Sequence, residues 1–399
     1  MSSQGTNTDE EEEEEVERRG FRDPASRHPA TTQPDRSQRP THESATASNR
    51  APATTVQNSA AWPGVAPASK QHPSGHDGIA ATDPSFEAAV LFSVYICHRN
   101  KDVYIRAGNV RFYLQRGVLP FCPEKSRVLT VFVVQREDDD GADEALTSLG
   151  LLGDSSEANQ RRDVVVLQRK NQGYDFGAFA EGLRFLSSSA PGGLRRFQHL
   201  MFLNDGVRGP FVPPCFPFGT HWTEAFFSRL RGRPDVGVVG SSLVVLPPPP
   251  KDPDGPGPRV EGFCFATRPE QVLWMIRDGV FRDFETKTSA ILEGEYGVSK
   301  SVLRRGFRLD CLVEAGQDVS DWNDPRNADW NDNLHPSREN SCFGASMHPF
   351  ETMFHKTAWT DRKTGSVSLV NENAWKRLTV LRKRGGGVFR PAFLPENLP

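Results

Sequence analysis

The segment 163–183, DVVVLQRKNQGYDFGAFAEGL, constrains the possible folds more than any other part of the chain. It starts with three consecutive valines, passes through a polar turn, and resumes at the spacing of one helix face with Phe176, Phe179 and Leu183. A strand, a turn and a helix in this order make half of a parallel α/β unit, and ligands bind such sheets at the carboxyl ends of the strands. The sequence therefore predicts an α/β fold with a candidate binding site at this turn.

The turn itself carries residues suited to contact a ligand. Gly173 and Gly177 allow positive φ and close approach of another group to the backbone. Asn171 contributes an amide, and Asp175 contributes a carboxylate near the positive end of the new helix. An aspartate before a helix is also a common N-cap, so the same residues fit a purely structural turn.

The rest of the chain from residue 86 alternates between apolar strand patterns and helical patterns. Strands are expected at 88–96, 128–134, 163–168, 199–204, 236–245, 260–267 and 307–313. Helices are expected at 103–114, 174–183, 222–230, 269–276, 289–305 and 371–383. Alternating strands and helices without an internal repeat predict a doubly wound, mainly parallel sheet.

Composition divides the chain into three parts. Residues 1–84 contain an acidic run and a long stretch rich in Ser, Thr, Pro and Gln, so this tail is expected to be disordered. Residues 85–360 are expected to form one α/β domain, and 361–399 a C-terminal helix and tail. The net charge of −3, with basic residues scattered rather than gathered on one face, excludes nucleic acid as an expected partner.

Removing residues 1–80 is expected to leave the melting temperature of the protein unchanged. The segment has scarcely any large apolar side chain, so it has little to contribute to a core. Thermal unfolding of the full and shortened chains measures this. Protease protection of the segment in the free protein would contradict it.

The cysteines and the hydropathy pattern indicate a soluble protein. Six cysteines are widely spaced, with no CxxC pair, and several lie in apolar runs, which favours buried free thiols over disulfides or zinc. No stretch is long and apolar enough for a transmembrane segment, and no signal peptide is recognisable. A cytoplasmic location is therefore expected.

Three further places hold candidate functional residues. Asn204 and Asp205 end the strand at 199–204, where an open α/β enzyme would hold a divalent metal, although Asp205 could equally bond its own turn. Glu295 lies three and seven residues before two valines, on the inward face of its helix, where a desolvated carboxylate suits a general base. Glu293 is the competing candidate. His348, followed by Glu351, is a metal ligand or a structural hydrogen-bonding residue.

Four motifs in this order resemble one family: NQGYDFGAF, FLNDGVRGPF, VEGFCFATR and EYGVSKSVLRRGF. They are similar to the rhamnan synthesis protein F group of glycosyltransferases and, more broadly, to GT-A fold enzymes that use nucleotide sugars. The resemblance covers roughly residues 88–315, with HPFETMFHK as a C-terminal companion. It implies a GT-A-like fold and hexosyl or deoxyhexosyl transfer from a nucleotide-sugar donor to a glycan or other hydroxyl acceptor, in polysaccharide synthesis.

The resemblance also implies roles for individual residues. The expected donor-binding residues are Asn171, Gly173, Asp175, Gly177 and Asn204. The expected ligands of a divalent cation, Mn or Mg, are Asp205 and His348, and Glu295 stands where an acceptor-activating base is expected. GT-A enzymes usually carry Asp-any-Asp where this chain reads Asn-Asp-Gly, which leaves a catalytically silent sugar-binding or scaffold protein as one alternative. The other is a different nucleotide-using α/β enzyme, a nucleotidyltransferase or a dehydrogenase, and the absence of GxGxxG after the first strand counts against the dehydrogenase.

Overall fold

The computed structural model describes residues 85–95, 102–137, 146–151, 160–189, 192–246, 257–313 and 347–360, with a few positions besides (83, 324, 336, 341 and 367–369). The tail predicted over 1–84, apart from residue 83, and the helix predicted at 371–383 lie outside the described residues.

A seven-stranded sheet organises the described part of the chain, in the order β10-β6-β9-β4-β1-β2-β3. Its strands are β1 (Ala88–Tyr95), β2 (Val128–Arg136), β3 (Val164–Lys170), β4 (His199–Asn204), β6 (Val236–Gly240), β9 (Cys264–Thr267) and β10 (Arg308–Cys311). Neighbours are parallel except at β9, which runs antiparallel to both β4 and β6. The predicted mainly parallel α/β fold is confirmed.

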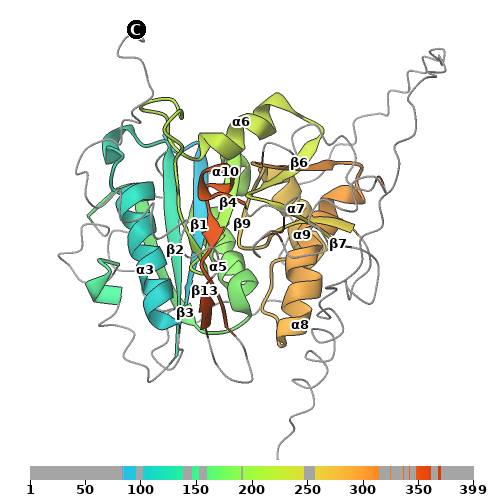
Figure 1. The fold of residues 1–399 in the computed structure, drawn as a ribbon, viewed down its shortest axis with the longest axis horizontal. Coiled ribbons are helices and arrows are strands. Elements are labelled where there is room, and N and C mark those ends of the chain that lie inside the picture. The colour runs from blue at the N-terminus through green and yellow to red at the C-terminus, as the bar shows by residue number, and fades with distance from the viewer. Residues whose placement is uncertain are drawn as a thin grey trace, which may run out of the picture. The chain divides into compact units, whose positions relative to one another are not determined.

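The continuous apolar strands are explained by cover on both faces of the sheet. On one face, Phe92 of β1 packs 4.6 Å, ring centre to ring centre, from Tyr113 of α3 (Val103–Tyr113). On the other face, Leu91 lies against Gly182 of α5 (Tyr174–Ser189). Successive residues of a strand point to opposite faces, so both need apolar neighbours. Figure 1 shows α3 and α5 on the two sides of the sheet, as a doubly wound fold requires.

The helices α6 (Glu224–Gly232) and α7 (Pro269–Arg277) follow the predicted pattern with small shifts of their ends. The helix predicted at 289–305 is divided into α8 (Lys287–Ser289), a π-helical turn and α9 (Tyr296–Leu303), and the short α10 (Pro349–Thr352) was not predicted. Two π-helical turns extend this set, η1 (Leu114–Val118) after α3 and η4 (Ala290–Glu295) between α8 and α9. Two 3₁₀ turns, η2 (Pro123–Lys125) and η3 (Gly193–Arg196), lie in connections.

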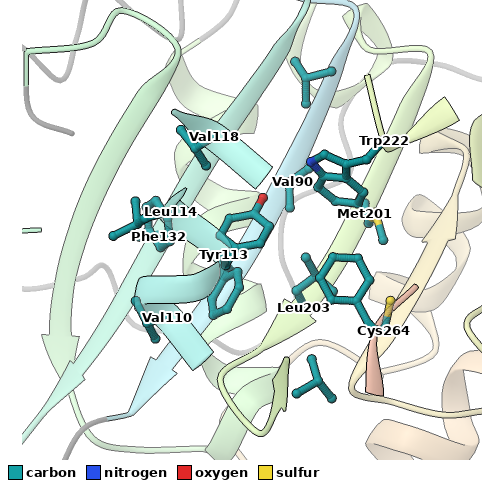
Figure 2. Packing of buried hydrophobic residues seen from close by; sticks show 14 of the residues in the cluster. Val90, Val110, Tyr113, Leu114, Val118, Phe132, Met201, Leu203, Trp222 and Cys264 are labelled. Atoms are coloured by element: carbon teal, nitrogen blue, oxygen red, sulfur yellow. The ribbon is translucent and has the colours of Figure 1, made fainter. Parts of the chain in front are cut away.

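A core of aromatic and branched side chains fills the space between the sheet and the helices α3 and α6. Figure 2 shows Tyr113 and Trp222 pointing into this core beside Phe132 and Met201. Trp222 is fully buried, and its indole Nε1 donates to the carbonyl of Gly117 at 2.9 Å. Because the indole nitrogen has a partner, the large ring can be buried without leaving a polar group unsatisfied.

Two of the predicted strands are each divided in the structure. The strand predicted at 236–245 becomes β6 and β7 (Leu243–Leu246), and that at 260–267 becomes β8 (Gly257–Val260) and β9. The amide of Ser241 donates to the carbonyl of Cys264 at 3.3 Å, and beyond this point β7 and β8 leave the main sheet and pair with each other. The turn between β8 and β9 begins at Glu261.

Two short antiparallel ribbons contain strands from residues 355–360 and 367–369. β11 (His355–Lys356) pairs antiparallel with β5 (Val207–Arg208), which directly follows β4. β12 (Ala358–Thr360) pairs with β13 (Val367–Leu369). Neither β5 nor β11 was predicted, because two residues are too few to show a periodic pattern. Their pairing places Lys356 beside the carboxyl end of β4.

The thiols in the described residues are all free, as predicted, but only half of them are buried. Cys264 and Cys311 lie in the sheet, whereas Cys122 and Cys215 are exposed, so the prediction of burial was wrong for these two.

Candidate functional site

The direction of winding of the main sheet changes between β1 and β4. The chain passes from β1 to β2 and β3 on one side, and later returns to place β4 on the other side of β1. At such a switch point the connections diverge, and α/β proteins bind ligands at the carboxyl ends of the two strands. Ser93 and Tyr95 of β1 lie at this edge, together with Asn204 of β4 and Asp205 directly after it.

Asp175 joins the three elements that meet at this edge. It lies in the first turn of α5, and its carboxylate accepts hydrogen bonds from Ser93 Oγ and from Asn204 Nδ2, both at 2.8 Å. Asn204 also receives the amide of Gly206 on its Oδ1 at 3.0 Å, which fixes its orientation. The structure thus brings together Asp175 and Asn204, two of the residues predicted to bind the donor. Ser93 was missed, because a single hydroxyl inside an apolar strand carries no signal.

The glycine turn before α5 is packed closely against another part of the chain. Gly173 has φ +77°, and a Cβ there would lie 2.4 Å from Asp283 Oδ1 and 2.5 Å from its Cα. A Cβ at Gly177 would lie 2.4 Å from the same oxygen. Arg169 Nη2 donates to this oxygen at 2.6 Å. Any side chain at either position would collide with Asp283, so both positions need glycine. The predicted contacts of these glycines with the donor stay predictions.

Asn171 lies at the end of β3 and is half-buried. Its Nδ2 donates to Glu137 Oε1 at 3.1 Å, and the hydroxyl of Tyr95 donates to the same oxygen at 2.8 Å. This small polar group continues the edge from β1 to β3. The donor-binding role of Asn171 stays a prediction.

Asp205 is held more tightly than any other residue proposed for the site. Its side chain is 1% exposed, Oδ2 accepts from the amide of Tyr95 and Oδ1 from Arg106 Nη1, both at 2.6 Å. Arg106 Nε donates in turn to Asp102 at 2.7 Å. Burial raises the pKa of Asp205 to about 6, although Arg106 opposes this shift. Asp205 therefore acts within the protein as an acceptor that fixes Arg106 and the end of β1.

The pH dependence of stability should carry a signature of Asp205. Its pKa of about 6 in the folded protein lies above its ordinary value of 3.8, so the folded state binds more protons between these values. The free energy of unfolding therefore falls as pH rises through this window, by roughly 2 to 3 kcal/mol at about 1.4 kcal/mol per pKa unit. Urea unfolding of wild type and Asp205→Asn measures this. The free energy of unfolding of wild type, relative to that of the variant, should fall with rising pH. A difference in this free energy that stays constant with pH would contradict the assignment.

Glu295 lies at the end of the π turn η4, which packs against the start of α5. Gly294 packs against the ring of Phe176, at a distance where a Cβ would lie 2.9 Å from the ring, so η4 and the start of α5 are in contact. Gly262 approaches the Glu295 side chain equally closely. Burial raises the pKa of the half-buried Glu295, the charge of Asp175 raises it further, and Lys356 and Arg259 oppose the shift. A carboxylate in this environment has the properties of a general base.

Glu293, the competing candidate, is exposed and forms an ion pair with Arg282. The geometry therefore favours Glu295 over Glu293, and the base assignment stays a prediction.

Glu261 is a second buried carboxylate beside Glu295 that the sequence analysis missed. It is 5% exposed, and its Oε2 accepts from Ser242 Oγ at 3.0 Å. Burial raises the pKa of Glu261 to about 7, and the neighbouring Glu295 contributes to the rise against Lys356. Glu261 opens the turn between β8 and β9, and that turn was hidden inside a segment predicted to be one strand.

His348 caps the start of the short helix α10. It is exposed, its Nδ1 accepts from the amide of Phe350 at 3.1 Å, and its own amide donates to Glu351 Oε2 at 2.7 Å. This is a capping box at the start of α10. The structure does not bring His348 and Asp205 together in any contact among the described residues.

These donor atoms do not fit a divalent cation. Both oxygens of Asp205 already accept hydrogen bonds and its side chain has almost no open surface. Within the described ranges, no three His, Cys, Asp or Glu side chains gather as a cation site would need. The metal roles predicted for Asp205 and His348 stay predictions. In the structure Asp205 accepts hydrogen bonds from Tyr95 and Arg106, and His348 caps α10.

A separate cavity of about 590 Å³ lies between α6, β10 and α10. Arg229 and Arg233 line it, and both contact Asp310. None of the predicted site residues lines this cavity, so it is distinct from the edge formed by the carboxyl ends of β1 and β4.

Comparisons with known proteins find structural likeness without a sequence family. The chain matches no family model and no curated protein. A nucleoside-diphosphate-sugar pyrophosphorylase from Vibrio cholerae RC9 is 11% identical at TM-score 0.32, over 57% of this chain and 93% of that chain. The inositol-1-phosphate CTP transferase from T. maritima is 13% identical at TM-score 0.29, over 57% and 85%.

A third similar structure is a Drosophila beta-1,4-galactosyltransferase 7 mutant in complex with manganese, UDP-Gal and xylobiose. It is 7% identical at TM-score 0.25, over 59% of this chain and 66% of that chain. At TM-scores this low the likeness carries no weight for activity, and the fold class rests on the strand topology. In the described part of the chain, every helix is too short or too polar to cross a bilayer.

Proposed function

We propose that the protein is a glycosyltransferase that moves a hexosyl or deoxyhexosyl group from a nucleotide-sugar donor to a hydroxyl acceptor. The observation that carries the proposal is the carboxyl edge of β1 and β4, where Ser93 and Asn204 donate hydrogen bonds to Asp175, and the charge of Asp175 acts on the half-buried Glu295. An oriented carboxylate and amide on one side, with a carboxylate of raised pKa on the other, suit recognition of a sugar and activation of a hydroxyl. The resemblance to rhamnan synthesis protein F supports a glycan acceptor in polysaccharide synthesis.

Each of the candidate site residues has its own role in the proposed reaction. Asn171, Asp175 and Asn204 bind and orient the donor, and the turn with Gly173 and Gly177 shapes its side of the pocket. Glu295 takes the proton of the acceptor hydroxyl as the oxygen attacks the anomeric carbon. The bond from that carbon to the diphosphate breaks, and its electron pair leaves with the diphosphate. Holding both substrates in line supplies much of the rate, because the reaction becomes effectively unimolecular.

The test is a hydrolysis and binding screen of the purified full chain against UDP-, GDP- and dTDP-sugars. Release of nucleoside diphosphate from one donor class is expected, and this release should depend on Asp175. Asp175→Asn removes the charge and leaves the shape, and Asp235→Asn is the control, because Asp235 is exposed and pairs with Arg308 before β6, at the opposite edge of the sheet. Donor binding without release, in the presence of acceptor glycans, would support the silent sugar-binding alternative. Neither binding nor release with any donor would contradict the proposal.

A further inference from the structure

We propose that Arg106 provides the positive charge at the carboxyl end of β4, so that the diphosphate of the donor binds without a divalent metal. This inference rests on the proposed function and names the cation of the same site. Three observations support it. Two carboxylates hold Arg106 in place, its Nη2 has no acceptor within the described ranges, and its guanidinium covers the carboxylate of Asp205.

Arg106 is fixed in place from two sides. It lies in the first turn of α3, its Nη1 donates to Asp205 at 2.6 Å and its Nε donates to Asp102 at 2.7 Å. Burial alone would lower the pKa of Arg106, but the two carboxylates hold it above its ordinary value. The guanidinium is therefore charged at every pH at which the protein is folded, and it is oriented before any ligand arrives.

The guanidinium retains hydrogen-bonding capacity towards a ligand. It has five N–H donors, of which Nε and Nη1 serve the two carboxylates. Within the ranges that the structure describes, no group accepts from Nη2, and 29% of the side chain is exposed. The planar guanidinium matches the spacing of phosphate oxygens, which makes arginine a common phosphate ligand in proteins.

A metal ion at Asp205 would have to displace Arg106. The carboxylate of Asp205 is 1% exposed, and each oxygen accepts a hydrogen bond at 2.6 Å. A hydrated ion has no path to these oxygens while the ion pair is closed. The carbonyl of Asp205 is occupied as well, because Asn109 Nδ2 donates to it at 2.8 Å. The side-chain and carbonyl oxygens of Asp205 are thus all bonded to protein groups, and Arg106 is the cation in direct contact with its carboxylate.

The experiment is calorimetric titration of the full chain with UDP, GDP and dTDP, first with EDTA and then with Mn²⁺. One nucleoside diphosphate is expected to bind with the same affinity in both conditions, and Mn²⁺ alone is expected to give no heat and no thermal stabilisation. Arg106→Gln is expected to weaken nucleoside diphosphate binding by roughly 10- to 100-fold, the worth of a hydrogen bond to a charged group.

Two controls separate binding from folding. Arg106→Gln leaves Asp205 buried without its cation, so the double variant Arg106→Gln/Asp205→Asn removes both charges together and should recover stability but not affinity. Arg111→Gln changes an exposed arginine on the same helix and should bind as wild type does. Melting temperatures of all variants identify those that fold.

The outcomes distinguish this inference from the proposed function. Binding that appears only with Mn²⁺, or unchanged affinity in the folded double variant, would overturn the role of Arg106 and leave the glycosyltransferase proposal intact. No binding of any nucleoside diphosphate, with or without Mn²⁺, would overturn both.

Discussion

Replacing Glu295 by glutamine is expected to lower the rate of sugar transfer by roughly 10²- to 10⁴-fold, the usual contribution of a positioned general base. Glutamine keeps the size and most of the hydrogen bonding of the side chain but cannot accept the proton. Donor affinity should therefore stay close to wild type, because the base acts on the acceptor. Single-turnover rates and donor titrations, measured on the same preparations, test the two halves of this expectation.

The pH profile of the wild-type protein tests the same proposed role. A general base must be deprotonated, so the proposal predicts that transfer rises with pH through the pKa of Glu295, which burial raises above the ordinary value of 4.5. Glu293→Gln is the matched control, because Glu293 is exposed and pairs with Arg282. If Glu293→Gln abolishes transfer while Glu295→Gln remains active, the base has been misassigned.

Gly173→Ala is expected to cause the largest loss of stability of any single methyl added near the site. The residue has φ +77°, which costs an alanine about 1 to 2 kcal/mol. The new Cβ would also lie 2.5 Å from the backbone Cα of Asp283, and overpacking typically adds about 1 to 3 kcal/mol. The two effects together should lower the free energy of unfolding by roughly 2 to 5 kcal/mol, as urea denaturation would show.

Gly219→Ala is the matched control for this variant. Gly219 has φ +76°, but a Cβ there would meet nothing within 4 Å, so only the backbone strain remains. Its cost should be about 1 to 2 kcal/mol. Equal losses in the two variants would mean that Asp283 moves aside freely and that the packing of the glycine turn contributes nothing.

The central sheet could be predicted because its strands are apolar on both faces and end in polar turns. The direction of β9 could not, since hydrophobic periodicity is the same for parallel and antiparallel strands. The division of the segments 236–245 and 260–267 was also invisible. Ser241 and Ser242 interrupt the first segment only weakly, and the break depends on an amide of Ser241 that bonds to Cys264, far along the chain.

The site was predictable where the position of a residue depends on a strand end. Asn204 and Asp175 follow the rule that ligands bind at the carboxyl edge of the sheet, and the structure joins them by a hydrogen bond at 2.8 Å. Arg106 was not predictable, because its partner Asp205 lies 99 residues away and nothing local marks that pair. Only the three-dimensional fold shows that the acidic end of β4 already has a cation.

The π turn at Ala290–Glu295 acts as a one-residue insertion in an otherwise α-helical segment. The amide of Tyr296 bonds to the carbonyl of Ile291, five residues back instead of four. Deleting one residue within this turn would restore regular helix, with each residue on one side rotated by about 100° relative to the other. Since α9 is anchored in the core by Val298 and Val302, such a deletion would keep the fold and turn the Glu295 carboxylate away from the start of α5. The π turn therefore sets the direction of this carboxylate independently of the packing that stabilises α9.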